Sequence, residues 1–440
     1  VVLPTLGLAL LPLASAMIGD LVKWYHILIV FDLIIPFMVF YLTDKVIAMR
    51  PGGYGETSLL ERNPLYYKYK SRKPYAKAVL LLIPILIIGA LPFIFQYTSL
   101  PDILGISKDY TFTQIGIGLF GTDQLFGFVT NGNGFVGPFG IVALFLGMLI
   151  PLGIAVFFSS AYKAKTKDLI VEKDKTRQLE DEFNNSLFQL GNRIGNGTPP
   201  ELAFGKIAEA SKGLVTEDFF RRVNYNVTQM GMDVERAIFD KKAGAIAYYP
   251  SELISTSMRI LIEAAKKGLK IAAMSLMSIS EYIKNIQKIT SRLKDMLAEI
   301  VSDMKSNMTF LAPLLSGVVV GLSFMITSII SKLKLSNLTS LGANAGSISS
   351  FLGPNGLFQL NKMIPPYHLQ IIIGIYLIEV VFILTRTLVA VDSGEDKLER
   401  TNKTGKNLIR ALGLYFVTAL ITSFLLFIIS SVVLGNLVSG

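Results

Sequence analysis

The residues best placed for phosphate chemistry lie in the stretch GNGTPPELAFGKIAEASKG, residues 195–213. A nucleotide-binding P-loop follows the pattern G-x-x-x-x-G-K-[ST], in which backbone N–H groups surround the phosphates and the hydroxyl helps to hold Mg²⁺. Around Gly205 and Lys206, Pro200 stands at the first glycine position and Ile207 at the hydroxyl position. Because proline has no N–H to donate, this stretch predicts two helices joined by a tight turn rather than an ATPase site.

Side chains that commonly carry metal or nucleophilic chemistry are scarce. The 440 residues include no cysteine and two histidines, His26 and His368. The sequence contains no H-E-x-x-H motif, and it offers no Ser-His-Asp arrangement at a recognisable spacing. We therefore expect no catalytic activity, no metal site and no cofactor.

The composition is that of a membrane protein. The chain is 51% hydrophobic and carries a net charge of +10, and several apolar segments reach the ~20 residues that a helix needs to cross a bilayer. The chain begins inside an apolar segment, without an initiator methionine or a basic n-region, so we expect upstream sequence rather than a signal peptide. We predict seven spans, at residues 1–19, 24–48, 75–97, 136–159, 308–331, 367–391 and 410–437.

Basic residues concentrate in some of the loops. Residues 49–74, 160–306 and 392–409 are rich in Lys and Arg, whereas residues 98–135 and 332–366 hold few. The positive-inside rule places the first three segments in the cytoplasm and the last two outside, with the C-terminus outside. This distribution accounts for the net charge without nucleic-acid binding.

The predicted fold class is therefore all-α: a polytopic membrane protein of about seven transmembrane helices with one large cytoplasmic helical domain. The divisions are a first transmembrane pair (1–48), a basic cytoplasmic loop (49–74), a transmembrane pair with an outer Gly-rich loop (75–159), the cytoplasmic helical domain with long stalk helices (160–306), a second such transmembrane pair (307–391), a basic cytoplasmic loop (392–409) and the last transmembrane helix (410–440).

Two outer loops share the pattern F-[VL]-G-P-x-G. It occurs at residues 135–140 and again at residues 351–356, each time shortly before an inward-going span. An internal duplication of span–loop–span units accounts for the repeat, and so do two ordinary Gly-Pro turns.

The segment 160–306 shows helical periodicity and almost no strand signal. Apolar residues recur at helical spacing from Phe183 to Ile194, and helix starts are expected at the N-caps Thr198 and Thr216, at Asp233 and at Ser251. A long helix from Leu269 to the span at 308 is expected to pair with the stretch 163–177 as a second stalk.

Three motifs in this domain resemble the type II secretion system F domain family. They are FNNSLFQLGNRIGNGTPPELAFGKIAEAS, GMDVERAIFD and IEAAKKGLKIAAMSLMSISEYI, in which helices follow glycine turns. The layout is similar to that of archaeal members with extra spans, whereas bacterial members carry two F domains and about three spans. The place of the second F domain would be taken by a domain upstream of this sequence or by the basic loop 49–77. The turn residues that match are Gly197, Pro199, Ala203, Gly231, Ala237 and Gly268.

The resemblance implies a membrane platform of a type IV filament machine, whether archaellum, archaeal pilus or a related secretion system. Such a platform lies in the plasma membrane among lipids, binds a cytoplasmic hexameric ATPase and passes pilin-like or archaellin subunits into a filament. A homodimer suits the family, and nucleic acid is not among the implied partners.

Basic residues on the cytoplasmic side are candidates for docking an acidic surface of the ATPase. A solvated face, or contact with anionic lipid headgroups, is the simpler interpretation of any single cluster. The candidates are Arg50, Arg221, Arg222, Lys241, Lys242, Lys266 and Lys267.

Ionisable residues also occur inside predicted spans. Asp32 and Glu379 lie near mid-membrane, and Arg386 lies two turns beyond Glu379. A charge at this depth costs at least about 2.5–3.5 kcal/mol, so such groups usually face protein or water. Three interpretations remain open: a polar seam that guides a pilin helix, the ion path of a secondary transporter, which is the alternative function, or a structural contact between helices.

Overall fold

The computed structural model describes most of the chain. The predicted first span, the second copy of the F-[VL]-G-P-x-G pattern, Arg50 and Lys241 lie outside the described residues. Within them the fold is almost entirely helical, with one antiparallel pair of short strands, β1 (Val129–Asn131) and β2 (Gly134–Val136). The described ranges are 23–48, 69–103, 105–114, 124–131, 134–240, 242–249, 251–332, 363–394 and 396–439.

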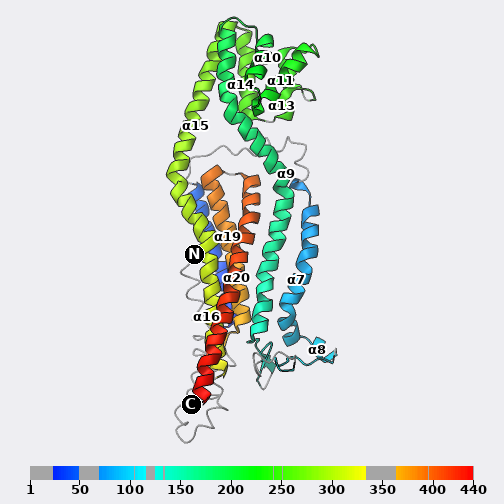
Figure 1. The fold of residues 1–440 in the computed structure, drawn as a ribbon, viewed down its shortest axis with the longest axis vertical. Helices are drawn as coiled ribbons and strands as arrows, with labels where there is room; N and C mark the ends of the chain where they lie inside the picture. Colours follow the sequence, from blue (N-terminus) through cyan, green and yellow to red (C-terminus); the bar gives the residue numbers. More distant parts are fainter. Residues whose placement is uncertain are drawn as a thin grey trace.

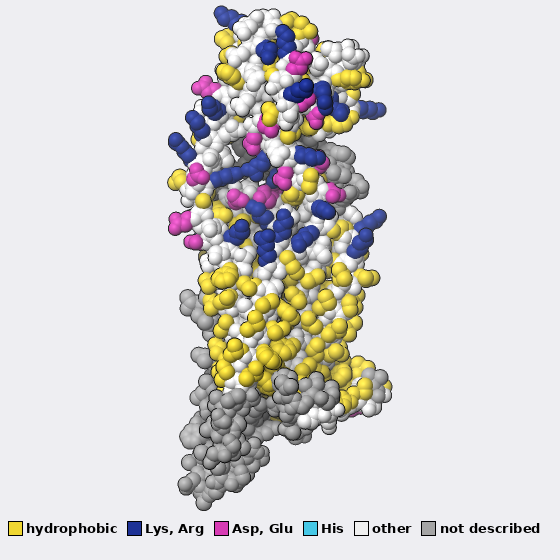
Figure 2. Space-filling view, viewed as in Figure 1, with side chains coloured by type: hydrophobic (Ala, Val, Ile, Leu, Met, Phe, Trp, Pro, Cys, Tyr) yellow, Lys and Arg dark blue, Asp and Glu magenta, His cyan; other side chains and the backbone are white. Residues whose placement is uncertain are grey.

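Six described helices are long and apolar enough to cross a membrane, and they coincide with the second to seventh predicted spans. The protein is therefore an all-α polytopic membrane protein. Figure 2 shows an apolar belt around these helices, with charged side chains gathered beyond one end of it. The helices are α3–η2–α4 (Trp24–Leu28, Ile29–Ile34, Ile35–Ala48), α7 (Lys73–Tyr97), α9 (Ile141–Gly195), α15–η4–α16 (Leu269–Ser306, Asn307–Leu311, Ala312–Lys332), α19 (Pro366–Ser393) and α20 (Lys397–Ser439).

The membrane helices pack closely where their residues are small. Gly317 of α16 lies against α20, where a Cβ would overlap the side chain of Thr418. One turn further along, the hydroxyl of Thr422 donates to the carbonyl of Gly317 over 2.9 Å. The missing side chain lets the two backbones approach, as small residues do in other membrane helix pairs.

Two continuous helices carry the chain out of the membrane belt. α9 runs for 55 residues from the belt to the far end of the molecule. α15 returns over 38 residues and continues through η4 into α16. At a rise of 1.5 Å per residue, α9 is about 80 Å long. Figure 1 shows the short helices of the domain gathered around the outer ends of these two.

The helical domain has a hydrophobic core separate from that of the membrane helices. Phe183 stacks on Phe220 with ring centroids 5.8 Å apart and meets Phe219 edge-on at 5.9 Å. The apolar residues predicted on one face of α9, including Leu187 and Ile194, are fully buried here. The remaining helices are α10 (Pro200–Ala210), α11 (Val215–Thr228), α12 (Val234–Phe239), α13 (Ala245–Tyr248) and α14 (Glu252–Ala265).

Two of the expected helix starts are confirmed, and the side chain there caps the helix. The Asp233 carboxylate accepts the N–H of Arg236 at 2.9 Å, and the Ser251 hydroxyl accepts the N–H of Ile254 at 3.2 Å. Each side chain satisfies one of the N–H groups left free at a helix start.

The predictions for Thr198 and Thr216 are wrong. Thr198 belongs to the turn that ends α9, where its N–H donates to Arg193, and Pro199 is the N-cap of α10. α11 begins one residue before Thr216, which is fully buried. The N–H of Thr216 donates instead to the side chain of Glu182 over 3.3 Å, and the Glu217 side chain accepts the N–H of Gly213 at 2.8 Å.

The predicted pairing of residues 163–177 with the long helix after Leu269 is also wrong. This part of α9 lies beside the start of α20, where the Thr166 hydroxyl donates to Asn402 over 3.4 Å. α9 meets α15 further out, where Ser280 donates to Asn184 over 2.7 Å. The start of α20 extends beyond the belt and takes the place beside α9 that α15 was expected to fill.

Candidate functional site

α9 brings one lysine into the turn between α19 and α20. The ammonium of Lys173 pairs with Asp396 and lies 3.1 Å from Glu399. These side chains are only 14%, 7% and 16% exposed. A basic residue on the helix that carries the domain is therefore held by two acids at the start of a membrane helix.

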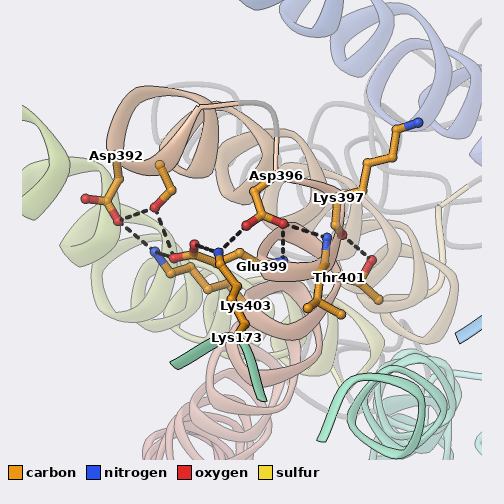
Figure 3. A network of polar contacts seen from close by, with 9 residues as sticks. Lys173, Asp392, Asp396, Lys397, Glu399, Thr401 and Lys403 are labelled. Carbon is orange, nitrogen blue, oxygen red and sulfur yellow. Dashed lines mark hydrogen bonds and ion pairs between the residues drawn. The ribbon is translucent and has the colours of Figure 1, made fainter. Parts of the chain in front are cut away.

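A second lysine extends the cluster along α20. Lys403 lies 2.7 Å from Asp392, the last acid of α19, and 2.7 Å from Glu399, one turn earlier on its own helix. The Ser393 hydroxyl donates to Glu399 at 3.1 Å. Figure 3 shows these groups converging in one continuous network. We call Lys173, Asp392, Asp396, Glu399 and Lys403 the charged junction.

Asp396 also starts α20. Its Oδ1 accepts the backbone N–H groups of Leu398 and Glu399 at 2.9 and 3.0 Å, while its other oxygen meets Lys173. The same carboxylate thus closes the first turn of α20 and ties that turn to α9. An acid at this position also opposes the positive end of the helix dipole.

The charges of the junction depend on one another. Its residues lie between the apolar segments 367–391 and 410–437, outside the membrane-spanning parts. Burial by itself would raise the pKa of Glu399, but hydrogen bonds and charge from Lys403 and Lys173 outweigh burial and lower this pKa to about 2. Removing one partner of such a buried pair typically costs about 3–5 kcal/mol, because the other charge is left uncompensated.

The junction holds the Lys173 ammonium between carboxylates that have further partners, and so ties α9 to the start of α20. Sequence reasoning missed this site, because it treated residues 392–409 as a basic loop. The available signal was the acidic run Asp392, Asp396 and Glu399 inside that loop.

The structure brings together two of the three predicted intramembrane residues. Asp32 lies in the π-helical turn η2, and Glu379 of α19 is close enough to interact with it electrostatically. Beside them the rings of Phe31 and Tyr376 meet edge-on at 6.4 Å. Both carboxylate oxygens of Asp32 and Oε2 of Glu379 are buried without a hydrogen-bond partner.

Arg386 is not part of that pair. Its guanidinium lies 2.6 Å from Asp44 near the end of α4 and 4.7 Å from the ring centre of Phe40. Both partners of the ion pair are partly exposed, at 32% and 51%. The polar seam expected between Glu379 and Arg386 is therefore divided between two partners on the α3–η2–α4 helix.

Several predicted docking residues are engaged within the domain. Arg221 pairs with Asp218 and Glu217 on its own helix. The guanidinium of Arg222 lies 3.5 Å from the ring centre of Tyr248.

Among the remaining described docking candidates, Lys266 has acidic partners within the domain. Lys266 lies 3.0 Å from Glu263 and 3.6 Å from Glu235. Lys242 and Lys267 are exposed, so they are the described candidates best placed to meet an external surface.

The six residues singled out at the turns all lie at turns or in the core. Gly197 and Gly231 lie in the turns after α9 and α11, and Pro199 is the N-cap of α10. Ala203 and Ala237 are fully buried. The sixth, Gly268, is the N-cap of α15 with φ +125°, a conformation that residues with a Cβ rarely adopt.

The described residues include no group of three or more His, Asp or Glu side chains that could hold a metal ion. Comparison of the chain with protein-family models, with curated proteins and with solved structures found no match. The functional argument therefore depends on the geometry and on the motifs of the helical domain.

Proposed function

We propose that this chain is the membrane platform of a type IV filament machine, an archaellum, pilus or related secretion system. In this proposal the helical domain is an F-type domain that docks a cytoplasmic hexameric ATPase. The membrane helices, seven with the predicted first span, pass pilin-like subunits into the filament. The chain itself catalyses no reaction.

One observation carries the proposal: a compact helical domain is joined to the membrane helices by two uninterrupted helices, α9 and α15–η4–α16. A displacement of the domain must pass along these helices, because neither contains a loop that could absorb it. The turn residues named by the resemblance also lie where a bundle of short helices needs them.

The distribution of charge supports a cytoplasmic domain. The turn between α19 and α20 lies at the same end of the apolar belt as the helical domain, and charged side chains gather there. The end of α4 lies there too, as the Asp44–Arg386 pair indicates. Under the positive-inside rule this end faces the cytoplasm of the cell, where an ATPase partner has access to it.

The direct test measures binding of the full-length protein in nanodiscs to the secretion-type ATPase of the same organism, together with the ATPase rate. We expect salt-sensitive binding that the exposed pair Lys242→Glu plus Lys267→Glu weakens strongly. As a matched control, Arg221→Glu plus Lys266→Glu changes the same charge at residues already engaged by neighbouring acids. Absence of binding by the folded protein would overturn the proposal.

A secondary transporter is the second candidate, and the Asp32–Glu379 pair favours it. Three carboxylate oxygens, both of Asp32 and Oε2 of Glu379, are buried without a hydrogen-bond partner next to a π-helical turn, a setting that suits ion binding in membranes. Ion-driven uptake into proteoliposomes that Asp32→Asn and Glu379→Gln both abolish would favour this function. Unchanged ion permeability in both variants would leave a structural contact between helices.

A further inference from the structure

The outer surface of α15 carries a row of exposed apolar residues between the domain and the membrane. Charged residues such as Lys294, Asp295 and Glu299 share this stretch, so it lies outside the hydrocarbon. The six large side chains of the row are 44% to 77% exposed: Tyr282, Ile286, Ile289, Leu293, Met296 and Ile300. We call these six residues the stalk seam.

The spacing of the stalk seam is that of a coiled coil. Successive members are four, three, four, three and four residues apart, which is the a/d repeat of the heptad. The row covers 18 residues of rise, about 27 Å. It is distinct from the inward face of the helix, where Ile283 is buried and Leu297 and Val301 are partly buried.

A seam with this period fits another helix that runs alongside α15. Figure 1 shows α15 along one edge of the molecule, with no described helix outside it. Exposing a row of apolar side chains to water is unfavourable, and covering the row with a partner lowers the free energy. A straight apolar row supplies no pocket or charge pattern for a globular partner.

We propose that the stalk seam pairs with the same seam of a second copy of this chain as a parallel two-stranded coiled coil. Two copies inserted in one membrane have the same orientation, so their seams lie parallel and at the same height. Ile289 then meets the second copy's Ile289, and Met296 its Met296, in the d layers.

The flanking positions are compatible with this self-pairing. In a parallel pair the g residues of one helix face the e residues of the other. The charged g residues Arg292 and Glu299 face apolar e positions, which hold Leu297 and Met304. No like charges therefore oppose each other across the seam.

Disulfide cross-linking tests the proposal, because the chain contains no cysteine of its own. Single variants Ile289→Cys and Met296→Cys are made in the full-length protein and oxidised in native membranes. The matched controls are the exposed neighbours Lys288→Cys and Asp295→Cys, which lie outside the seam. We expect a disulfide-linked product of twice the monomer mass from the two seam variants, because a parallel pair brings each residue to its own counterpart.

Three outcomes would overturn the proposal: equal cross-linking at seam and control positions, absence of cross-linking at both seam positions in folded protein, or a product whose mass identifies a different protein. A second pair of variants tests whether cross-linking depends on the apolar seam itself. Leu293→Asp should abolish cross-linking of Met296→Cys, whereas Lys294→Asp should leave it unchanged. Both substitutions are at exposed positions, so the fold of a single copy should tolerate them.

Discussion

The two helices that connect the domain to the membrane differ in their surroundings between the apolar belt and the domain: α9 is held by buried charges, whereas α15 is exposed on one side. α9 carries a buried lysine held by two acids of the α19–α20 turn, so it cannot slide without stripping partners from charged groups. α15 carries the exposed stalk seam over the corresponding part of its length and is held again only as α16, by close packing against α20.

This difference separates a fixed support from a free one. Breaking buried charge pairs costs several kcal/mol, whereas moving a half-exposed apolar row through water costs little. Within a single copy, movement of the domain would therefore displace α15 more easily than α9. The membrane end of that helix lies against α20, whose first turn belongs to the charged junction.

The largest expected effect comes from removing the lysine that holds α9. Lys173→Met takes the ammonium away from the buried Asp396, while Glu399 keeps Lys403, and should lower the free energy of unfolding by about 3–5 kcal/mol. The matched control is Lys175→Met, where a lysine that is 64% exposed loses only a surface partner, with an expected change within about 1 kcal/mol. Denaturant unfolding of the purified protein measures both. Equal effects would show that α9 is not held by the junction.

A smaller effect is expected where α16 meets α20. Gly317→Ala places a methyl group against Thr418 and 2.8 Å from the backbone nitrogen of Ala419, which should cost about 1–3 kcal/mol. Gly413→Ala is the control, because a Cβ there meets nothing within 4 Å. Thermal unfolding of the two variants should shift in opposite directions or by clearly different amounts. A neutral Gly317→Ala would mean that the α15–α16 helix is free in the membrane as well.

Acid should weaken the hold on α9 in a defined range of pH. The pKa of Glu399 is lowered to about 2 in the folded protein, so its stabilisation is complete above the ordinary glutamate pKa and is lost as pH falls toward about 2. Between about pH 7 and pH 4 the loss should be about 1 kcal/mol. The difference in stability between the wild type and Glu399→Gln, measured at each pH, should shrink over this range. A constant difference would argue against an ionised Glu399 in the junction.

The smallest effect is expected on the stalk of α15. Met296→Ser changes a side chain that is 77% exposed, so the unfolding free energy of a single copy should change by no more than about 0.5 kcal/mol. Denaturant unfolding at a dilution where single copies prevail is the measurement. A loss comparable to that of Lys173→Met would mean that both supports are held equally, and the contrast between them would disappear.

Much of the helical architecture was predictable because it depends on local pattern. Runs of about 20 apolar residues locate membrane helices, and the caps Asp233 and Ser251 act on the N–H groups three residues ahead. The cap predictions failed at two threonines, each of which precedes a helix in the sequence as an N-cap would. Thr198 is used by the turn before α10, and Thr216 is buried inside the first turn of α11.

The charged junction could not be predicted in the same way, since its members are far apart in the chain. Lys173 lies more than 200 residues before Asp396, and a lysine among several on a solvated helix gives no local sign that it is the buried one. Likewise Asp32 meets Glu379, while Arg386, on the same helix as Glu379, pairs with Asp44.

The sequence by itself determined which segments are helical, which of them are apolar enough for a membrane, and where glycines and caps divide the domain. These features follow from hydrophobic periodicity and from the needs of individual helix ends. Only the tertiary structure decided which of the two long helices is held by buried charge and which presents a bare apolar row. That choice depends on which helix lies beside the start of α20, and no pattern within either helix encodes its neighbour.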